Sequence, residues 1–191
     1  MKEKTGELGG LYAAFIEEVR QYKTGEACKK GCSFCCTHAG TIDITTLEGL
    51  AIQEAMTSLP SALHKTVARA LRRDFRNREK GVIGPCPFLL KNSACMIYSA
   101  RPFSCRRITS MDVCSRDNPP RLHRHVMDVA ETTIKALQQL DTTGYSGHIS
   151  FVLNLLEQTA FSQVYLSGDF RPKDIMEFGK SHRIIINRLV S

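Results

Sequence analysis

The feature that most constrains this chain is the grouping of its eight cysteines into two windows. The first window, residues 28–36, and the second, residues 86–114, hold four each: Cys28, Cys32, Cys35 and Cys36, then Cys86, Cys95, Cys105 and Cys114. Thiolates bind zinc and iron–sulfur clusters, and the Cys-x-x-Cys spacing of Cys32 and Cys35 lets two sulfurs face one ion. We therefore predict that the fold brings both windows together around metal, with all eight cysteines as candidate ligands.

The first window has two further features that bear on ligation. Its first three cysteines read Cys-x3-Cys-x2-Cys, so three sulfurs can converge on one site. Cys35 and Cys36 are adjacent, and neighbouring side chains of an extended segment point to opposite sides. We expect these two cysteines to differ in role. Which cysteines are spare stays open, as do the roles of Cys114 and of His38, which follows the pair.

The second window bears on the identity of the metal. Structural zinc domains usually carry two Cys-x-x-Cys pairs, and the second window contains none. This favours an iron–sulfur cluster, [4Fe–4S] foremost, over zinc. Apolar neighbours such as Phe34, Phe88 and Phe103 would shield a cluster from solvent, although they would equally serve an ordinary core.

The chain contains no apolar run of the ~20 residues that a bilayer span needs, and residues 1–7 are polar and mixed in charge. We therefore expect a cytoplasmic protein that does not bind membranes. In a reducing compartment, clustered cysteines indicate metal binding or catalysis. A disulfide framework is the alternative, although 191 residues can bury a core without cross-links.

Hydrophobic periodicity predicts a mainly α-helical fold with one domain over residues 1–191. The cysteine-cluster region would span about residues 28–114, and a helical extension about 119–191. The predicted helices cover residues 8–23, a segment from a Thr45/Glu48 capping box to about Leu59, an arginine-rich segment after Pro60, residues 121–140, and a buried segment from Ile149. We expect at most a small β-hairpin near residues 86–98.

The net charge of +7 is concentrated in two stretches. Residues 61–80 carry seven Lys or Arg against two acidic residues, and residues 101–125 carry six Arg against two. Basic patches suit nucleic acids, acidic proteins or anionic cofactors, and a solvated helix face is the commoner explanation. The arginine-rich helix lacks interleaved aromatic residues on which bases could stack, so a nucleic-acid partner is not favoured. A protein partner is possible, and binding of a nucleic acid stays open as an alternative.

The ordered motifs of both windows resemble those of the YkgJ-type cysteine-cluster proteins, which are described as zinc- or iron-chelating domains. The motifs are Cys32-Ser33-Phe34-Cys35-Cys36, Cys86-Pro87-Phe88-Leu89, Cys95-x-Ile97-Tyr98 and Arg101-Pro102-x-x-Cys105, over about residues 28–107. The commonest family opening is Cys-x-x-Cys-x-x-Cys-Cys, and this chain has one more residue between its first two cysteines. The resemblance implies metal binding.

Three classes of function remain. The first is a metal or redox binding module. The second is an enzyme, because the family's cysteine region is similar to that of flagellin lysine N-methylases, which use S-adenosylmethionine. The sequence shows neither a catalytic residue nor a glycine-rich loop for a nucleotide, so enzyme activity stays open. The third is a basic module for a protein or nucleic-acid partner, with a structural metal.

Overall fold

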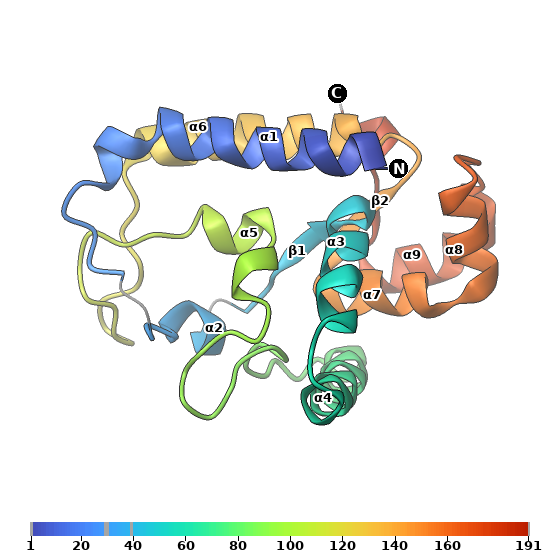
Figure 1. Cartoon of the computed structure of the whole chain (residues 1–191), viewed down its shortest axis with the longest axis horizontal. Coiled ribbons are helices and arrows are strands. Elements are labelled where there is room, and N and C mark those ends of the chain that lie inside the picture. The colour runs from blue at the N-terminus through green and yellow to red at the C-terminus, as the bar shows by residue number, and fades with distance from the viewer. Residues whose placement is uncertain (1, 29–30, 39, 191) are drawn as a thin grey trace.

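The computed structural model describes residues 2–28, 31–38 and 40–190. Most of them are helical, which confirms the predicted class, and a small sheet lies among the helices (Figure 1). The helices are α1 (Lys2–Glu18), α2 (Phe34–His38), α3 (Thr46–Thr57), α4 (Ser61–Glu79), α5 (Phe103–Arg106), α6 (Arg124–Leu140), α7 (Ile149–Glu157), α8 (Thr159–Leu166) and α9 (Met176–His182). The strands are β1 (Asp43–Thr45), β2 (Tyr145–His148) and β3 (Ile185–Ile186), and 3-10 turns lie at Arg20–Lys23, Tyr98–Ala100, Pro172–Ile175 and Asn187–Leu189.

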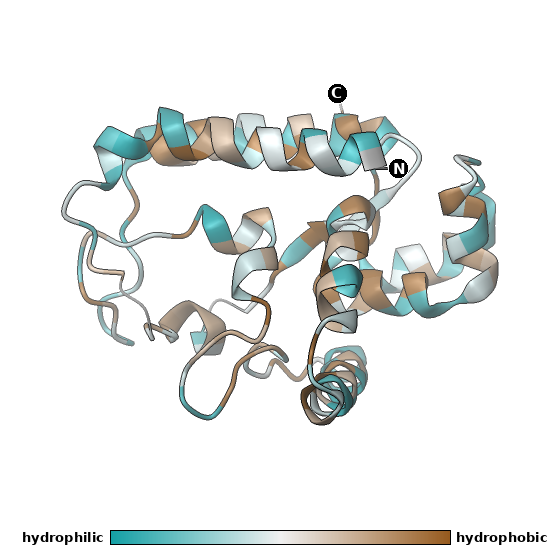
Figure 2. Cartoon of the chain, in the orientation of Figure 1, coloured by the Kyte–Doolittle hydropathy of each residue, from teal (hydrophilic) through white to brown (hydrophobic). Residues whose placement is uncertain are grey.

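Helices α1 and α6 run antiparallel along one side of the molecule (Figure 1). Both interleave hydrophobic and hydrophilic residues (Figure 2), and each buries one face. Phe15 lies in α1, and Val19 directly follows this helix. Both pack with Val126 and Leu137 of α6 and with Phe103 of α5. The predicted helix over residues 8–23 therefore begins earlier and ends at Glu18, before a separate 3-10 turn.

A second core lies beneath α7, which is buried almost all round as its sequence predicts. Ile52 of α3, Val67 of α4 and Val152 of α7 meet there. Phe88 and Ile97 belong to the same core, and they stand beside Cys86 and Cys95 in the sequence. The second cysteine window is thus anchored by burial of its apolar residues.

The sheet is antiparallel, in the order β1-β2-β3, and is additional to the elements predicted from sequence. Asp43 of β1 faces His148 of β2, and Tyr145 of β2 faces Ile186 of β3. The predicted hairpin near residues 86–98 is reduced to one bridge between Leu89 and Cys95. Within the described residues, no helix is long and apolar enough to cross a bilayer.

Candidate metal centre

The two cysteine windows meet in space. The backbone N–H of Cys86 donates to the carbonyl oxygen of Cys36 at 2.7 Å, which joins the windows directly. The thiols of Cys86, Cys95 and Cys105 each interact electrostatically with Cys35. Cys36 interacts with Cys35, Cys86 and Cys105. We call these five residues the five-thiol cluster.

Short local elements position the members of this cluster. Cys35 and Cys36 lie in α2, so the extended geometry expected for them is wrong. Neighbours in a helix are separated by about 100°, and both thiols can therefore lie on one side. Cys95 is held by its bridge to Leu89 and by the turn before it, where Ser93 adopts a φ of 63°. Cys105 lies in α5.

Hydrogen bonds to Glu48 and from Arg106 hold helix α5 in place. The N–H of Phe103, its first residue, donates to Oε1 of Glu48 at 2.7 Å. Arg106 follows Cys105, and its guanidinium donates to the carbonyl oxygens of Arg101 and Ser99, each at 2.7 Å. The loop before α5 and the helix itself therefore form one braced unit that presents Cys105.

Burial makes the thiols of Cys86, Cys95 and Cys105 hard to ionise without a nearby cation. It raises the pKa of Cys86 to about 11 and that of Cys105 to about 12. The positive charge of Arg101 opposes the rise in the pKa of Cys95 and Cys105. The thiol of Cys36 donates to Cys35, which lowers the pKa of Cys35 to about 6 and raises that of Cys36. A metal would replace the thiol protons and supply the missing positive charge.

The other three cysteines form a separate group. Cys28 interacts electrostatically with Cys32 and Cys114. Its sulfur accepts a hydrogen bond from the N–H of Ser110 at 3.3 Å, and the carbonyl oxygen of Ser110 accepts from the N–H of Ala27 at 2.8 Å. The structure thus groups Cys35 with the second window, whereas the Cys-x3-Cys-x2-Cys spacing places it with Cys28 and Cys32.

The chemistry of the five-thiol cluster fits zinc or an iron–sulfur cluster, because all five of its side chains are free thiols. Among the described residues, however, no three Cys, His, Asp or Glu side chains are arranged to hold a metal ion. The five thiols therefore lie within electrostatic range of one another without forming a metal site in this arrangement. Metal binding by these thiols would require their sulfurs to rearrange.

The histidines near the cysteines make other contacts. His38 lies at the end of α2, where Nδ1 is 2.7 Å from Oγ1 of Thr37 and the ring stacks on Phe34. His123 caps α6 by accepting a hydrogen bond from the N–H of His125 at 3.2 Å. Both histidines therefore have local structural roles in this arrangement.

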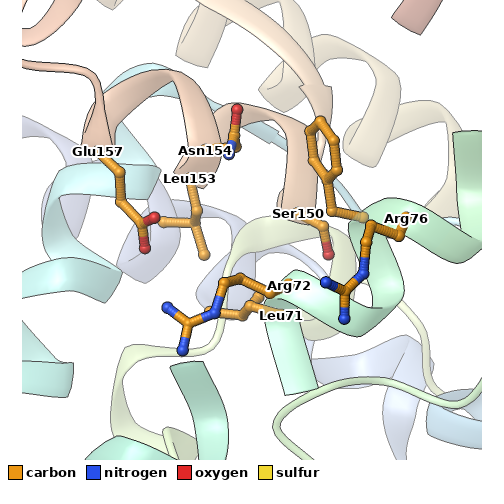
Figure 3. Close-up of a pocket in the computed structure, with 8 residues that line it drawn as sticks. Leu71, Arg72, Arg76, Ser150, Leu153, Asn154 and Glu157 are labelled. Carbon is orange, nitrogen blue, oxygen red and sulfur yellow. The ribbon is translucent and has the colours of Figure 1, made fainter. Parts of the chain in front are cut away.

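A cleft and a pocket outside the five-thiol cluster are not predicted by any pattern in the sequence. A cleft of about 990 Å³ is lined by residues of the three strands and of α3, α4, α5, α6, α7 and α9. Ser104 and Arg107, on either side of Cys105, belong to its wall. A smaller pocket of about 210 Å³ lies between α4 and α7, where Figure 3 shows Arg72 and Arg76 on one side and Glu157 on the other. Lining residues this far apart in the chain give no pattern by which either hollow could be predicted.

The fold and the site together define a mainly helical cysteine-cluster domain of the metal-chelating class. Residues 27–139 match the CxxCxxCC family, described as "Putative zinc- or iron-chelating domain". The match spans more than half of the 191 residues, so the chain belongs to this family, and the resemblance seen in the sequence is confirmed. Neither the curated proteins nor the solved structures contain a match.

Proposed function

We propose that the chain is a metal or redox binding module whose centre is held by Cys35, Cys86, Cys95 and Cys105. The observation that carries the proposal is the 2.7 Å hydrogen bond from the N–H of Cys86 to the carbonyl oxygen of Cys36, which joins the two windows. The positive charge of Arg101 lowers the pKa of Cys35, Cys95 and Cys105 together, which supports it. Cys36 is the neighbouring donor, and a hydrogen bond to a ligand sulfur tunes the potential of an iron–sulfur cluster. The remaining three cysteines are not needed for a four-ligand centre.

The surroundings favour an iron–sulfur cluster, [4Fe–4S] foremost, with zinc as the alternative. The side chains of Phe88, Ile97 and Phe103 are each at most 3 % exposed. Each lies two positions from a cysteine of the cluster in the chain. Such apolar residues keep water from a cluster, and solvent exposure is one of the factors that set its potential. We propose that metal enters on the Cys35 side, where a pocket of about 390 Å³ is lined by Cys35, Phe34 and Pro119.

Substitution of single cysteines tests this assignment. Cys105→Ser should lose most of the metal bound by anaerobically purified protein, because it removes one of the four proposed ligands. Cys32→Ser is the matched control, since Cys32 is exposed and belongs to the other group. Metal content per chain, compared at equal folded fraction by circular dichroism, is the measurement. Equal metal loss in both variants, or loss in Cys32→Ser alone, would overturn the assignment.

The two other classes of function have less support. The sheet has three short antiparallel strands, which do not provide the parallel strand–helix crossover that commonly binds a nucleotide, and this argues against a methylase built on such a site. Helix α4 exposes Arg69, Arg72, Arg73 and Arg76, but Arg78 donates to Asp74 at 2.9 Å and to the carbonyl oxygen of Gly40 at 2.8 Å. The basic face is therefore smaller than its sequence suggests.

A further inference from the structure

The cleft beside α5 has the size of a small-molecule site. Its volume of about 990 Å³ lies at the upper end of the ~300–1,000 Å³ that such sites occupy. One wall is the face of the sheet that carries Asp43 and His148, which oppose each other across β1 and β2. The other walls come from α3, α4, α5, α6, α7 and α9.

His148 contributes a buried donor to this cleft. Its side chain is 6 % exposed, and its Nδ1 accepts a hydrogen bond from the N–H of Ser150 at 3.3 Å at the start of α7. A neutral imidazole that accepts at Nδ1 carries its proton on Nε2. Nε2 is buried and has no hydrogen-bond partner among the described residues. Burial also lowers the pKa of His148 to about 4, which keeps the ring neutral.

Arg107 contributes a second buried donor. Its Nε is buried and likewise lacks a hydrogen-bond partner within the described part of the chain. Two further arginines, Arg78 and Arg183, line the cleft. Arg78 is already bound to Asp74 and to the carbonyl oxygen of Gly40. The charge of Arg107 reaches Asp43, the cross-strand neighbour of His148, so the two donors lie around the same part of the cleft.

We propose that the cleft binds a small molecule that carries a carboxylate or phosphate group, with Arg107 Nε–H and His148 Nε2–H as donors to it. Buried donors are almost always hydrogen-bonded, and an oxyanion accepts from both while it balances the charge of Arg107. The carboxyl groups of Asp43, Glu48 and Glu79 also line the cleft and limit how much negative charge the site accepts, which favours one anionic group over several. The proposal goes beyond metal binding, because none of these residues is a thiol.

The test is an NMR titration of the metal-loaded chain with inorganic phosphate and, separately, with acetate and citrate at constant ionic strength. The Arg107 Nε–H and His148 Nε2–H resonances should shift in a saturable way. Phosphate without carboxylate binding would assign the ligand to the phosphate class, and the converse would assign it to the carboxylate class. Linear, unsaturated shifts in every series would show that the two donors serve water, and would overturn the proposal.

Arg107→Lys keeps the charge and removes the Nε–H donor. The affinity should fall about tenfold or more, because a hydrogen bond between charged groups is lost. Arg69→Lys, on the exposed face of α4, is the matched control and should leave affinity unchanged. Metal content measured on each variant shows whether the centre next to Arg107 is intact. Equal affinity in Arg107→Lys and Arg69→Lys with intact metal would contradict the proposal, whether or not the metal assignment holds.

Discussion

The carboxylate of Glu48 connects three helices behind the five-thiol cluster. Oε2 accepts from the N–H of Thr45 at 2.8 Å and completes the capping box of α3 that the sequence predicts. Oε1 accepts from the hydroxyl of Tyr12 at 2.6 Å and from the N–H of Phe103 at 2.7 Å. A cap visible in the sequence therefore has a second task, which is to hold α5 and Cys105 in place.

Glu48→Gln should lower the free energy of unfolding by about 1–3 kcal/mol, because an amide nitrogen replaces one acceptor and leaves a buried donor unpaired. Glu54→Gln, at an exposed position of the same helix, should change it by less than about 0.5 kcal/mol. Urea unfolding of the two variants measures the difference. Equal stability of the two would show that Glu48 acts only as a local cap.

Asp141 is fully buried and joins α3 to the helices that follow it. It accepts from the N–H of Leu47 at 3.0 Å and from the hydroxyl of Tyr165 at 2.7 Å. Burial raises the pKa of Asp141 to about 6 from its ordinary value of 3.8, against the opposite effect of these hydrogen bonds. The folded state therefore binds the proton more tightly than the unfolded state.

The tighter proton binding of Asp141 in the folded state contributes to the free energy of unfolding. This contribution is complete below about pH 4 and is lost as the pH rises through about 6. We expect the stability advantage of the wild type over Asp141→Asn, which cannot titrate there, to shrink by about 2–3 kcal/mol across this range. Urea unfolding at several pH values provides the measurement. A difference that stays constant from pH 4 to 7 would contradict the raised pKa.

At the scale of elements, the contact between α3 and α7 depends on Gly49. A Cβ placed there would lie 2.7 Å from Cδ1 of Leu156 and 3.3 Å from Cγ1 of Val152. The glycine thus allows close approach of two helices that form the core beneath the second cysteine window.

Gly49→Val should lower the free energy of unfolding by about 1–3 kcal/mol through overpacking. Glu54→Val introduces the same side chain at an exposed position of α3 and should cost only about 0.5 kcal/mol of helix propensity. Thermal and urea unfolding distinguish the two. A stabilised Gly49→Val would mean that α7 moves away at little cost.

The longer helices were predictable from sequence because their apolar spacing and caps are local signals. Helix α3 begins at its capping box, and α4 begins after Pro60 as expected. The sheet was not predictable, because its strands are two to four residues long and Asp43 pairs with His148 far along the chain. Helices α2 and α5 are too short to show a periodic pattern.

At the scale of the whole molecule, the sequence identified the eight cysteines and the meeting of the two windows but not their division into groups. That division into two groups depends on the positions that the loops give to the individual cysteines in the folded chain. The buried Ser110 holds Cys28 near Cys114, and the backbone bond from Cys86 to Cys36 draws the second window toward α2. The cleft is likewise a property of the assembled molecule, since residues of six helices and of all three strands of the sheet line it.

The proposed metal centre takes its four thiol ligands from both cysteine windows. Anaerobic alkylation of the metal-loaded chain with iodoacetamide, followed by mass mapping, tests this assignment directly. Cys35, Cys86, Cys95 and Cys105 should be protected until the metal is removed with a chelator, while Cys28, Cys32 and Cys114 should react in both states. Protection of Cys28 and Cys32 with free reaction of Cys86 and Cys105 would contradict the account.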